Sequence, residues 1–288
     1  MEDFNMNGSS QDRGCDYTYI TFYYNQEAGF IIKVVTSVTF CIGLPLTLMA
    51  IYALYSQVQS DHVAPIYVIN LLISDLIQHC CLIVEVAQIK SWTTFTICTL
   101  IYYVCVGASV GFMVCVALER YLVIVFPLWY RFRRTIRVSV LVCVAVWAFP
   151  VVSLLSVFWW KNCKAKETIV TVYLLLPLPL LVFFLGGTLR GLSASVSVPS
   201  DEKRRIVGML VLVLLIYTLL FLPTIILLLV YGARDNDILR SLFPVFFRFS
   251  PLADLVLYIF MKKGVVDRLL ASVCCFRADS NDVSGSVV

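Results

Sequence analysis

Seven long apolar runs constrain the fold of this chain more than any other feature of its sequence. They lie at residues 29–55, 64–89, 96–126, 137–160, 168–192, 205–231 and 238–261. Each is near or above the ~20 residues that an α-helix needs to cross a bilayer. The runs lack the period-two alternation of a membrane β-barrel, and only helices or closed barrels satisfy their backbone in lipid. We therefore predict an all-α membrane protein with a bundle of seven transmembrane helices.

The composition agrees with a membrane protein and excludes several function classes. Only 14% of the residues are charged, against roughly 25% in soluble domains. The net charge of +4 is too small to indicate a nucleic-acid partner, and only two histidines are present. No metal-ligand or nucleophile–base cluster stands inside the apolar runs, so we do not expect an enzyme. A transporter or channel would need a polar stripe and often inverted repeats, and no repeat is visible.

The distribution of Lys and Arg predicts the orientation in the membrane. One set of loops carries thirteen of these residues and the other set the remaining nine of 22, and the richer set is expected in the cytoplasm. We therefore expect a plasma-membrane protein with residues 1–28 as an extracellular tail, 29–261 as the bundle and 277–288 as a cytoplasmic tail. Asn7 begins an Asn-Gly-Ser glycosylation sequon on the outer side.

Residues 262–276 are expected to form a short amphipathic eighth helix in the inner interface, because their apolar residues repeat at helical spacing. Cys274 and Cys275 at its end are either palmitoylated or unmodified cytosolic thiols. The terminal residues Ser286, Val287 and Val288 have the Ser-x-apolar-carboxylate form that strand-adding scaffold domains accept.

The third apolar run carries a charged pair, Glu119 and Arg120, near one end. From Cys98 to Arg120 the helix rises about 33 Å, so these residues lie at opposite faces of the membrane. Charge at a membrane boundary is costly unless something uses it. Together with Tyr121 and the seven spans, this junction resembles that of the rhodopsin-like (class A) G-protein-coupled receptors, most closely the nucleotide, lipid and free-fatty-acid receptor branch.

That resemblance covers essentially the whole chain and implies a function. A receptor of this family passes an extracellular signal to a heterotrimeric G protein, and arrestin is a further partner. It implies that Arg120 pairs with Glu119 at rest and is released toward the G protein on activation, with Tyr121 and Tyr258 in the same switch. The second inner loop and the basic run at residues 203–205 would complete the coupling surface.

A polar pocket in the middle of the membrane is also implied. Asp75, Ser109 and Asp254 stand at the positions that resemble the family's sodium pocket, and hard oxygen ligands suit a hard cation. Asp254 replaces the usual asparagine four residues before Tyr258. The alternative is a satisfied buried polar network without an ion.

Several positions depart from the family pattern. Thr47 stands where relatives nearly always have asparagine, and Leu185 stands where a tyrosine normally helps hold the active state. In the switch of the sixth helix, Phe221 replaces a tryptophan two residues before Pro223, and Tyr217 replaces a phenylalanine one turn earlier. These departures indicate either an atypical receptor or an unusual resting activity, so signalling without a ligand is the main alternative function.

The family resemblance also implies a disulfide between Cys98 and Cys163 on the oxidising outer side. Relatives have three more residues between this cysteine and the arginine, which makes the present helix about 4.5 Å shorter. Cys15 is a third outer cysteine and is left over or pairs elsewhere.

Charged residues near the outer half are the candidates for ligand binding, because desolvating them demands a partner. Lys166 and Arg240 stand where free-fatty-acid receptors hold a carboxylate with arginines, which implies a small anionic or lipid-like ligand; alternatively both are solvated loop-end charges. Glu85 and Arg248 lie well inside spans and are expected to pair with each other first and to contact ligand second. Proton sensing through outer histidines is disfavoured by the positions of His62 and His79.

Overall fold

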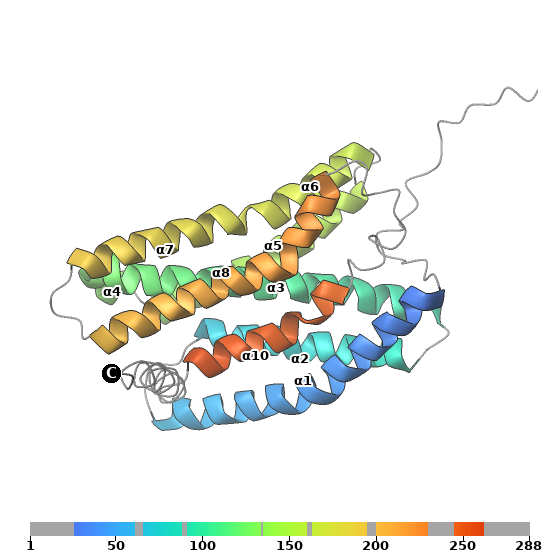
Figure 1. Cartoon of the computed structure of the whole chain (residues 1–288), viewed down its shortest axis with the longest axis horizontal. Helices are drawn as coiled ribbons and strands as arrows, with labels where there is room; N and C mark the ends of the chain where they lie inside the picture. Colours follow the sequence, from blue (N-terminus) through green and yellow to red (C-terminus); the bar gives the residue numbers. More distant parts are fainter. Residues whose placement is uncertain are drawn as a thin grey trace, which may run out of the picture.

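The computed structural model describes residues 26–60, 66–87, 91–133, 135–159, 163–194, 200–229 and 245–261. Every regular element in these ranges is a helix (Figure 1). The bounds are α1 Gln26–Ser60, α2 Ile66–Val86, α3 Trp92–Val125, α4 Pro127–Arg133, α5 Ile136–Trp159, α6 Cys163–Leu175, α7 Pro177–Ala194, α8 Ser200–Leu229 and α10 Ser250–Met261. A short helical turn at 245–248 precedes α10.

Six spans in the described ranges are long and apolar enough to cross a membrane, and α10 is a shorter apolar helix that completes the bundle. The fifth span, Thr168–Ser193, is divided into α6 and α7. The division falls at Pro177, which has no backbone N–H to continue the ladder. The predicted all-α fold is confirmed, whereas the amphipathic helix expected at 262–276 lies outside the described residues.

α3 is the central helix of the bundle. It packs against α2, α5, α7 and α8, and 67% of its spanning window is buried against 11% for α5. In Figure 1, α10 lies between α8 on one side and the pair α1 and α2 on the other. Residues of α3 can therefore contact most of the other helices, which makes it the element that positions the candidate site.

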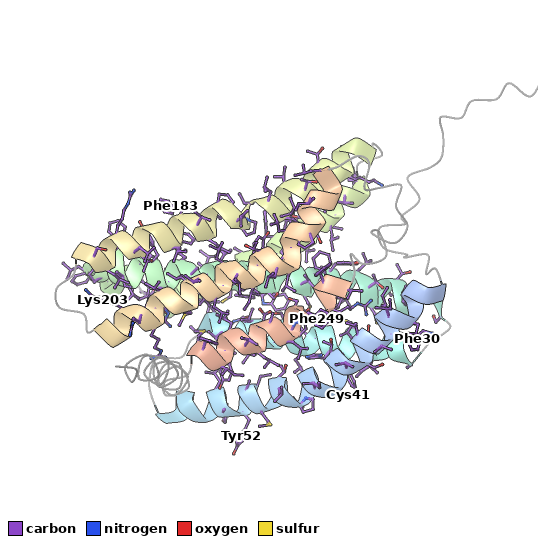
Figure 2. All side chains as sticks on the ribbon, viewed as in Figure 1. Phe30, Cys41, Tyr52, Phe183, Lys203 and Phe249 are labelled. Atoms are coloured by element: carbon purple, nitrogen blue, oxygen red, sulfur yellow. The ribbon has the colours of Figure 1, made fainter. Side chains whose placement is uncertain are left out.

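The surface of the bundle is apolar in the way that a lipid solvent allows. Large side chains on α1 such as Phe30 and Tyr52 are 69% and 75% exposed, and Figure 2 labels them along that helix. In water such faces would need a partner, whereas hydrocarbon chains cover them at no cost. The exposed faces of the helices thus agree with a multi-pass membrane protein.

The helix α4 was not predicted from the sequence. It follows α3 after the single residue Phe126 and packs back against it. Below, the end of the bundle that holds Arg120, α4 and the first turn of α8 is called the Arg120 end. The opposite end, where α3 begins, is called the Cys98 end.

Candidate functional site

Glu119 and Arg120 do not form the predicted ion pair. The phenol of Tyr130 in α4 donates to Glu119 Oε1 over 2.8 Å. Arg120 Nε is buried without a hydrogen-bond partner, and within the described part of the chain Arg120 forms no ion pair with Glu119. Adjacent residues of a helix point in different directions, and α4 brings a donor that fits Glu119 better. The pair is thus absent from this structure, and its formation in the resting receptor stays a prediction.

Tyr121, the third residue of the motif, is fixed against α7. Its ring centroid lies 5.6 Å from that of Phe183 and 5.5 Å from that of Phe184. A Cβ at Gly187 would collide with the Tyr121 ring, so glycine is required where the two helices approach. This packing fixes the inner part of α3 against α7 directly beside Arg120.

The three residues of the predicted sodium pocket are brought together. Asp75 on α2, Ser109 on α3 and Asp254 on α10 are all fully buried, and Asp75 is an electrostatic neighbour of Asp254. Ser109 Oγ lies 3.4 Å from Ser250 Oγ, and Gln78 Nε2 donates to Asp75 Oδ1 over 3.4 Å. Sequence reasoning missed Ser250 and Gln78, although helical spacing from the two aspartates could have found them.

The oxygen atoms in this pocket fit a small hard cation. Asp75 Oδ2 and both carboxylate oxygens of Asp254 are buried without a hydrogen-bond partner, which is costly in an apolar interior. Asp75, Asp254, Ser109 and Ser250 would together hold Na⁺, whose single charge would balance one of the two carboxylates. No cluster of three or more His, Cys, Asp and Glu suited to another metal occurs in the described ranges.

The predicted switch residues of the sixth helix lie on α8 in the centre of the bundle. Tyr217 and Phe221 are 1% and 0% exposed, and their rings stack with centroids 4.9 Å apart. The Tyr217 hydroxyl donates to the main-chain oxygen of Leu174 on α6, and Phe221 contacts Phe247 at 5.3 Å. Pro223 lies inside the same helix.

At the Arg120 end, two basic residues bond α8 to the ends of its neighbours. Lys203 Nζ donates to the oxygen of Leu192 over 3.0 Å, and Arg205 Nη2 donates to the oxygen of Met261. These carbonyls belong to the last turns of α7 and α10, where helices lack internal donors and favour cations. Figure 2 labels Lys203 at this end. Two of the three basic residues predicted for coupling thus hold α8 in place, while Arg204 is exposed.

Arg248 lies at the start of the seventh span in the half of the bundle toward the Cys98 end. It is 7% exposed, its Nη1 donates to Thr36 Oγ1 over 2.9 Å, and its guanidinium carbon lies 5.5 Å from the Tyr102 ring centroid. The Tyr102 hydroxyl donates to the oxygen of Phe247 over 2.8 Å. Arg248 therefore joins α1 to α3 in a buried polar cluster.

The remaining candidate ligand residues are placed only in part. Lys166 lies half-buried on α6, which packs against α5, α7 and α8. Arg240 lies outside the described residues, and for Glu85 the structure describes the backbone in α2 but not the side chain. The carboxylate grip by Lys166 and Arg240 and the pairing of Glu85 with Arg248 therefore stay predictions.

His79 occupies the space that the departure at Thr47 leaves. Its imidazole is fully buried between α2 and α1, with Nε2 3.4 Å from Thr47 Oγ1. A Cβ at Gly43 would lie 2.5 Å from His79 Cε1. The imidazole thus supplies the polar contact between the two helices, which the sequence alone did not indicate.

Cys98, one of the two cysteines of the predicted disulfide, carries a free thiol in this structure. It is half-buried in the second turn of α3, with Cys81 of α2 as an electrostatic neighbour. The spacing to Arg120 is shorter than in relatives by a rise of about 4.5 Å, and the pairing of Cys98 with Cys163 stays a prediction. Only the backbone of Cys163 is described, at the start of α6. Asn7, Cys274, Cys275 and residues 286–288 lie outside the described ranges.

Comparison with known proteins gives one family match. A model described as "7 transmembrane receptor (rhodopsin family)" matches residues 46–171. This range includes Asp75, Ser109 and the Glu119–Arg120–Tyr121 motif.

Several receptors are similar in sequence. G-protein coupled receptor 68 of Mus musculus is 26% identical over 261 residues, covering 77% of this chain and 71% of that protein. Free fatty acid receptor 3 of Homo sapiens is 32% identical over 133 residues, covering 43% of this chain and 38% of that protein. A purinoceptor of Gallus gallus is 27% identical over 165 residues, covering 54% of this chain and 50% of that protein.

Proposed function

We propose that the chain is a rhodopsin-like (class A) G-protein-coupled receptor, as the family match over residues 46–171 and the similar receptors indicate, and that it passes a signal from a small anionic or lipid-like ligand to heterotrimeric G proteins. Its relatives are receptors and not enzymes. The ligand class, the coupling residues and the orientation of the chain belong to the proposal.

The arrangement around Arg120 is the observation that supports coupling best. The Tyr130 hydroxyl donates a hydrogen bond to Glu119, and the buried Nε of Arg120 has no acceptor. A cation at the membrane boundary gains most from a partner that supplies acceptors there. A peptide segment of a G protein, entering at the Arg120 end, would offer carbonyl and carboxylate oxygens to this guanidinium.

Replacing Arg120 with alanine tests this role. Dissociation of the heterotrimer is measured in cells by energy transfer between its subunits, with the signal divided by the number of receptors at the surface. We expect Arg120→Ala to lose most of the signal and Arg190→Ala, which removes an exposed arginine from α7, to keep it. Equal signalling by native receptor and Arg120→Ala would sink the proposal.

Arg248 supports an anionic ligand. It is a cation buried among α1, α3 and the start of the seventh span, and burying a cation is favourable only when acceptors or an anion accompany it. Two similar proteins are named as a free fatty acid receptor and a purinoceptor. A carboxylate or phosphate that reaches Arg248 from the Cys98 end would replace part of its present contacts.

A ligand panel tests this second step. Fatty acids, nucleotides and lysophospholipids are applied to cells that express the native chain, Arg248→Gln, Arg240→Ala or Lys166→Ala. Arg248→Gln keeps a donor near Thr36 and removes the charge, so the potency of an anionic agonist should fall by at least about tenfold, as for loss of a charge-assisted contact. An anionic agonist with the same potency on all four receptors would contradict the anion-binding proposal.

Signalling without a ligand is the alternative function. It is favoured by the missing Glu119–Arg120 pair and by Leu185, which stands where a tyrosine is usual. Second-messenger output that rises in proportion to receptor number in ligand-free medium would favour this alternative. Output that rises only slightly with receptor number and increases strongly when a ligand is added would favour the ligand-dependent receptor.

The orientation and the tail partners complete the proposal. We propose an extracellular N-terminus in the plasma membrane with Asn7 glycosylated, arrestin as a second cytoplasmic partner, palmitoylation of Cys274 and Cys275, and a scaffold domain at residues 286–288. An epitope at the N-terminus should be stained in intact cells and one at the C-terminus only after permeabilisation. The reverse pattern would overturn the orientation and, with it, the cytoplasmic role of Arg120.

A further inference from the structure

The break in the fifth span leaves a main-chain acceptor in the middle of the bundle. α6 ends at Leu175 and α7 begins at Pro177, which has no N–H to offer to the turn before it. Leu176 N still donates to Val172 O over 3.0 Å. The carbonyl of Leu174, which lies beside this break, accepts the hydroxyl of Tyr217 from α8.

The Tyr217 hydroxyl makes this contact from a fixed position. Its residue is 1% exposed and its ring stacks on Phe221 at an interplanar angle of 20°. A buried hydroxyl that loses its acceptor in an apolar interior is costly. Any arrangement that moves α8 away from the break must therefore lose this bond, while the ring stacking needs no hydroxyl at all.

A series of contacts links this bond to the cluster around Arg248. Phe221 contacts Phe247 with centroids 5.3 Å apart. The oxygen of Phe247 accepts the Tyr102 hydroxyl, and Tyr102 lies under the guanidinium of Arg248. Displacement of Arg248 or Tyr102 would thus shift Phe247, which is packed directly against the stacked pair on α8.

The same helix is held at the Arg120 end by Lys203 and Arg205, which bond it to α7 and α10. The structure therefore shows α8 fixed against its neighbours both at its first turns and at its middle. We propose that the Tyr217 hydroxyl is a positioning group that favours the resting arrangement of the receptor by bonding α8 to the break between α6 and α7. This inference rests on the proposed function for its consequence in signalling.

Removal of one oxygen atom tests the inference. Tyr217→Phe keeps the ring and loses the bond, whereas the control Thr218→Val loses a neighbouring hydroxyl that bonds only within α8, to Leu214 O. Interhelical hydrogen bonds in membrane proteins correspond to roughly a three- to tenfold change in a conformational ratio. Tyr217→Phe should therefore raise the ligand-free activity of the receptor about three- to tenfold, and Thr218→Val should leave it unchanged.

Two readouts are taken on purified full-length receptor in nanodiscs. One is the rate of GTP-analogue uptake by added heterotrimer. The other, measured on separately labelled receptor so that uptake is read with Arg204 intact, is the distance distribution between spin labels at Ser193 on α7 and Arg204 on α8, which are both exposed. The labels are attached through unnatural amino acids because the chain has 11 cysteines. Tyr217→Met, which also lacks the hydroxyl, is the second variant if the first unfolds.

The two readouts separate the possible failures. A larger long-distance population together with faster uptake supports the inference. A larger long-distance population without any uptake supports the positioning role of Tyr217 and overturns the proposed coupling to G proteins. Unchanged distances in a folded Tyr217 variant, or an equal change in Thr218→Val, overturn the inference.

Discussion

Replacing Gly43 with alanine should destabilise the bundle by about 1–3 kcal/mol, the usual cost of forcing a methyl group into a packed interior. The new Cβ would lie 2.5 Å from Cε1 and 2.9 Å from Nε2 of His79, and 3.4 Å from Leu252 Cδ2. The His79 ring is fully buried, so any shift of the ring must take place within the packed interior. Moving it would also stretch the 3.4 Å contact between Nε2 and Thr47 Oγ1, which adds to the cost.

The measurement is thermal unfolding of purified receptor in nanodiscs, followed with a dye that reacts with cysteines such as Cys105 and Cys115 as they leave the buried state. A loss of this size lowers Tm by roughly 2–10 °C for a chain of this length. Gly186→Ala is the control, since a Cβ there meets no atom within 4 Å, and its Tm should stay equal or rise slightly.

A double-mutant cycle identifies the partner. When His79→Ala is present, Gly43→Ala should cost much less, which gives a coupling free energy of about 1–3 kcal/mol. Two results would refute the reasoning. One is a Gly43→Ala variant with the same Tm as the native protein, and the other is a Gly186→Ala variant that loses as much stability as Gly43→Ala. Equal costs of Gly43→Ala with and without His79 would show that another contact is responsible.

Two further predictions follow from the ends and the centre of the bundle. Arg205→Met leaves the last carbonyl of α10 without its donor, so ligand-free GTP-analogue uptake should rise about two- to tenfold. Arg190→Met, which changes an exposed residue of α7, should have no effect. A fall with Arg205→Met would contradict the role given to this bond. The Tm of the native protein should be higher in sodium chloride than in choline chloride at equal ionic strength, because an ion bound only to the folded state stabilises it. Asp254→Asn should remove that difference. A native Tm that is the same in both salts would contradict the ion site.

The spans and much of the polar pocket were predictable from the sequence because lipid imposes strong rules. Backbone groups without partners are excluded from hydrocarbon, so apolar runs mark helices with little ambiguity. Asp75, Ser109 and Asp254 were predicted to meet because they stand at positions that resemble the family's sodium pocket. Their meeting in space agrees with the family resemblance, and Ser250 follows from the helical repeat.

Contacts that depend on the rotation of helices were not predictable. The sequence shows that Tyr217 departs from the family, but only the structure shows that its hydroxyl meets the Leu174 carbonyl at the break before Pro177. Likewise, Tyr130 reaches Glu119 because α4 turns back along α3, and no periodicity in seven residues indicates this. These contacts depend on shifts of about an ångström between helices, which residue patterns do not encode.

The central claim is that the Arg120 end of this receptor activates a heterotrimeric G protein. The most direct measurement is GTP-analogue uptake by purified heterotrimer mixed with native receptor, Arg120→Ala receptor or empty nanodiscs. The ligand-free rate is measured over a range of receptor concentrations, and the measurement is repeated with the Tyr217→Phe variant. We predict uptake that rises with native receptor, rises further with Tyr217→Phe and falls to the empty-disc rate with Arg120→Ala. Uptake at the empty-disc rate for folded native and Tyr217→Phe receptors, across heterotrimers of every class, would contradict the account.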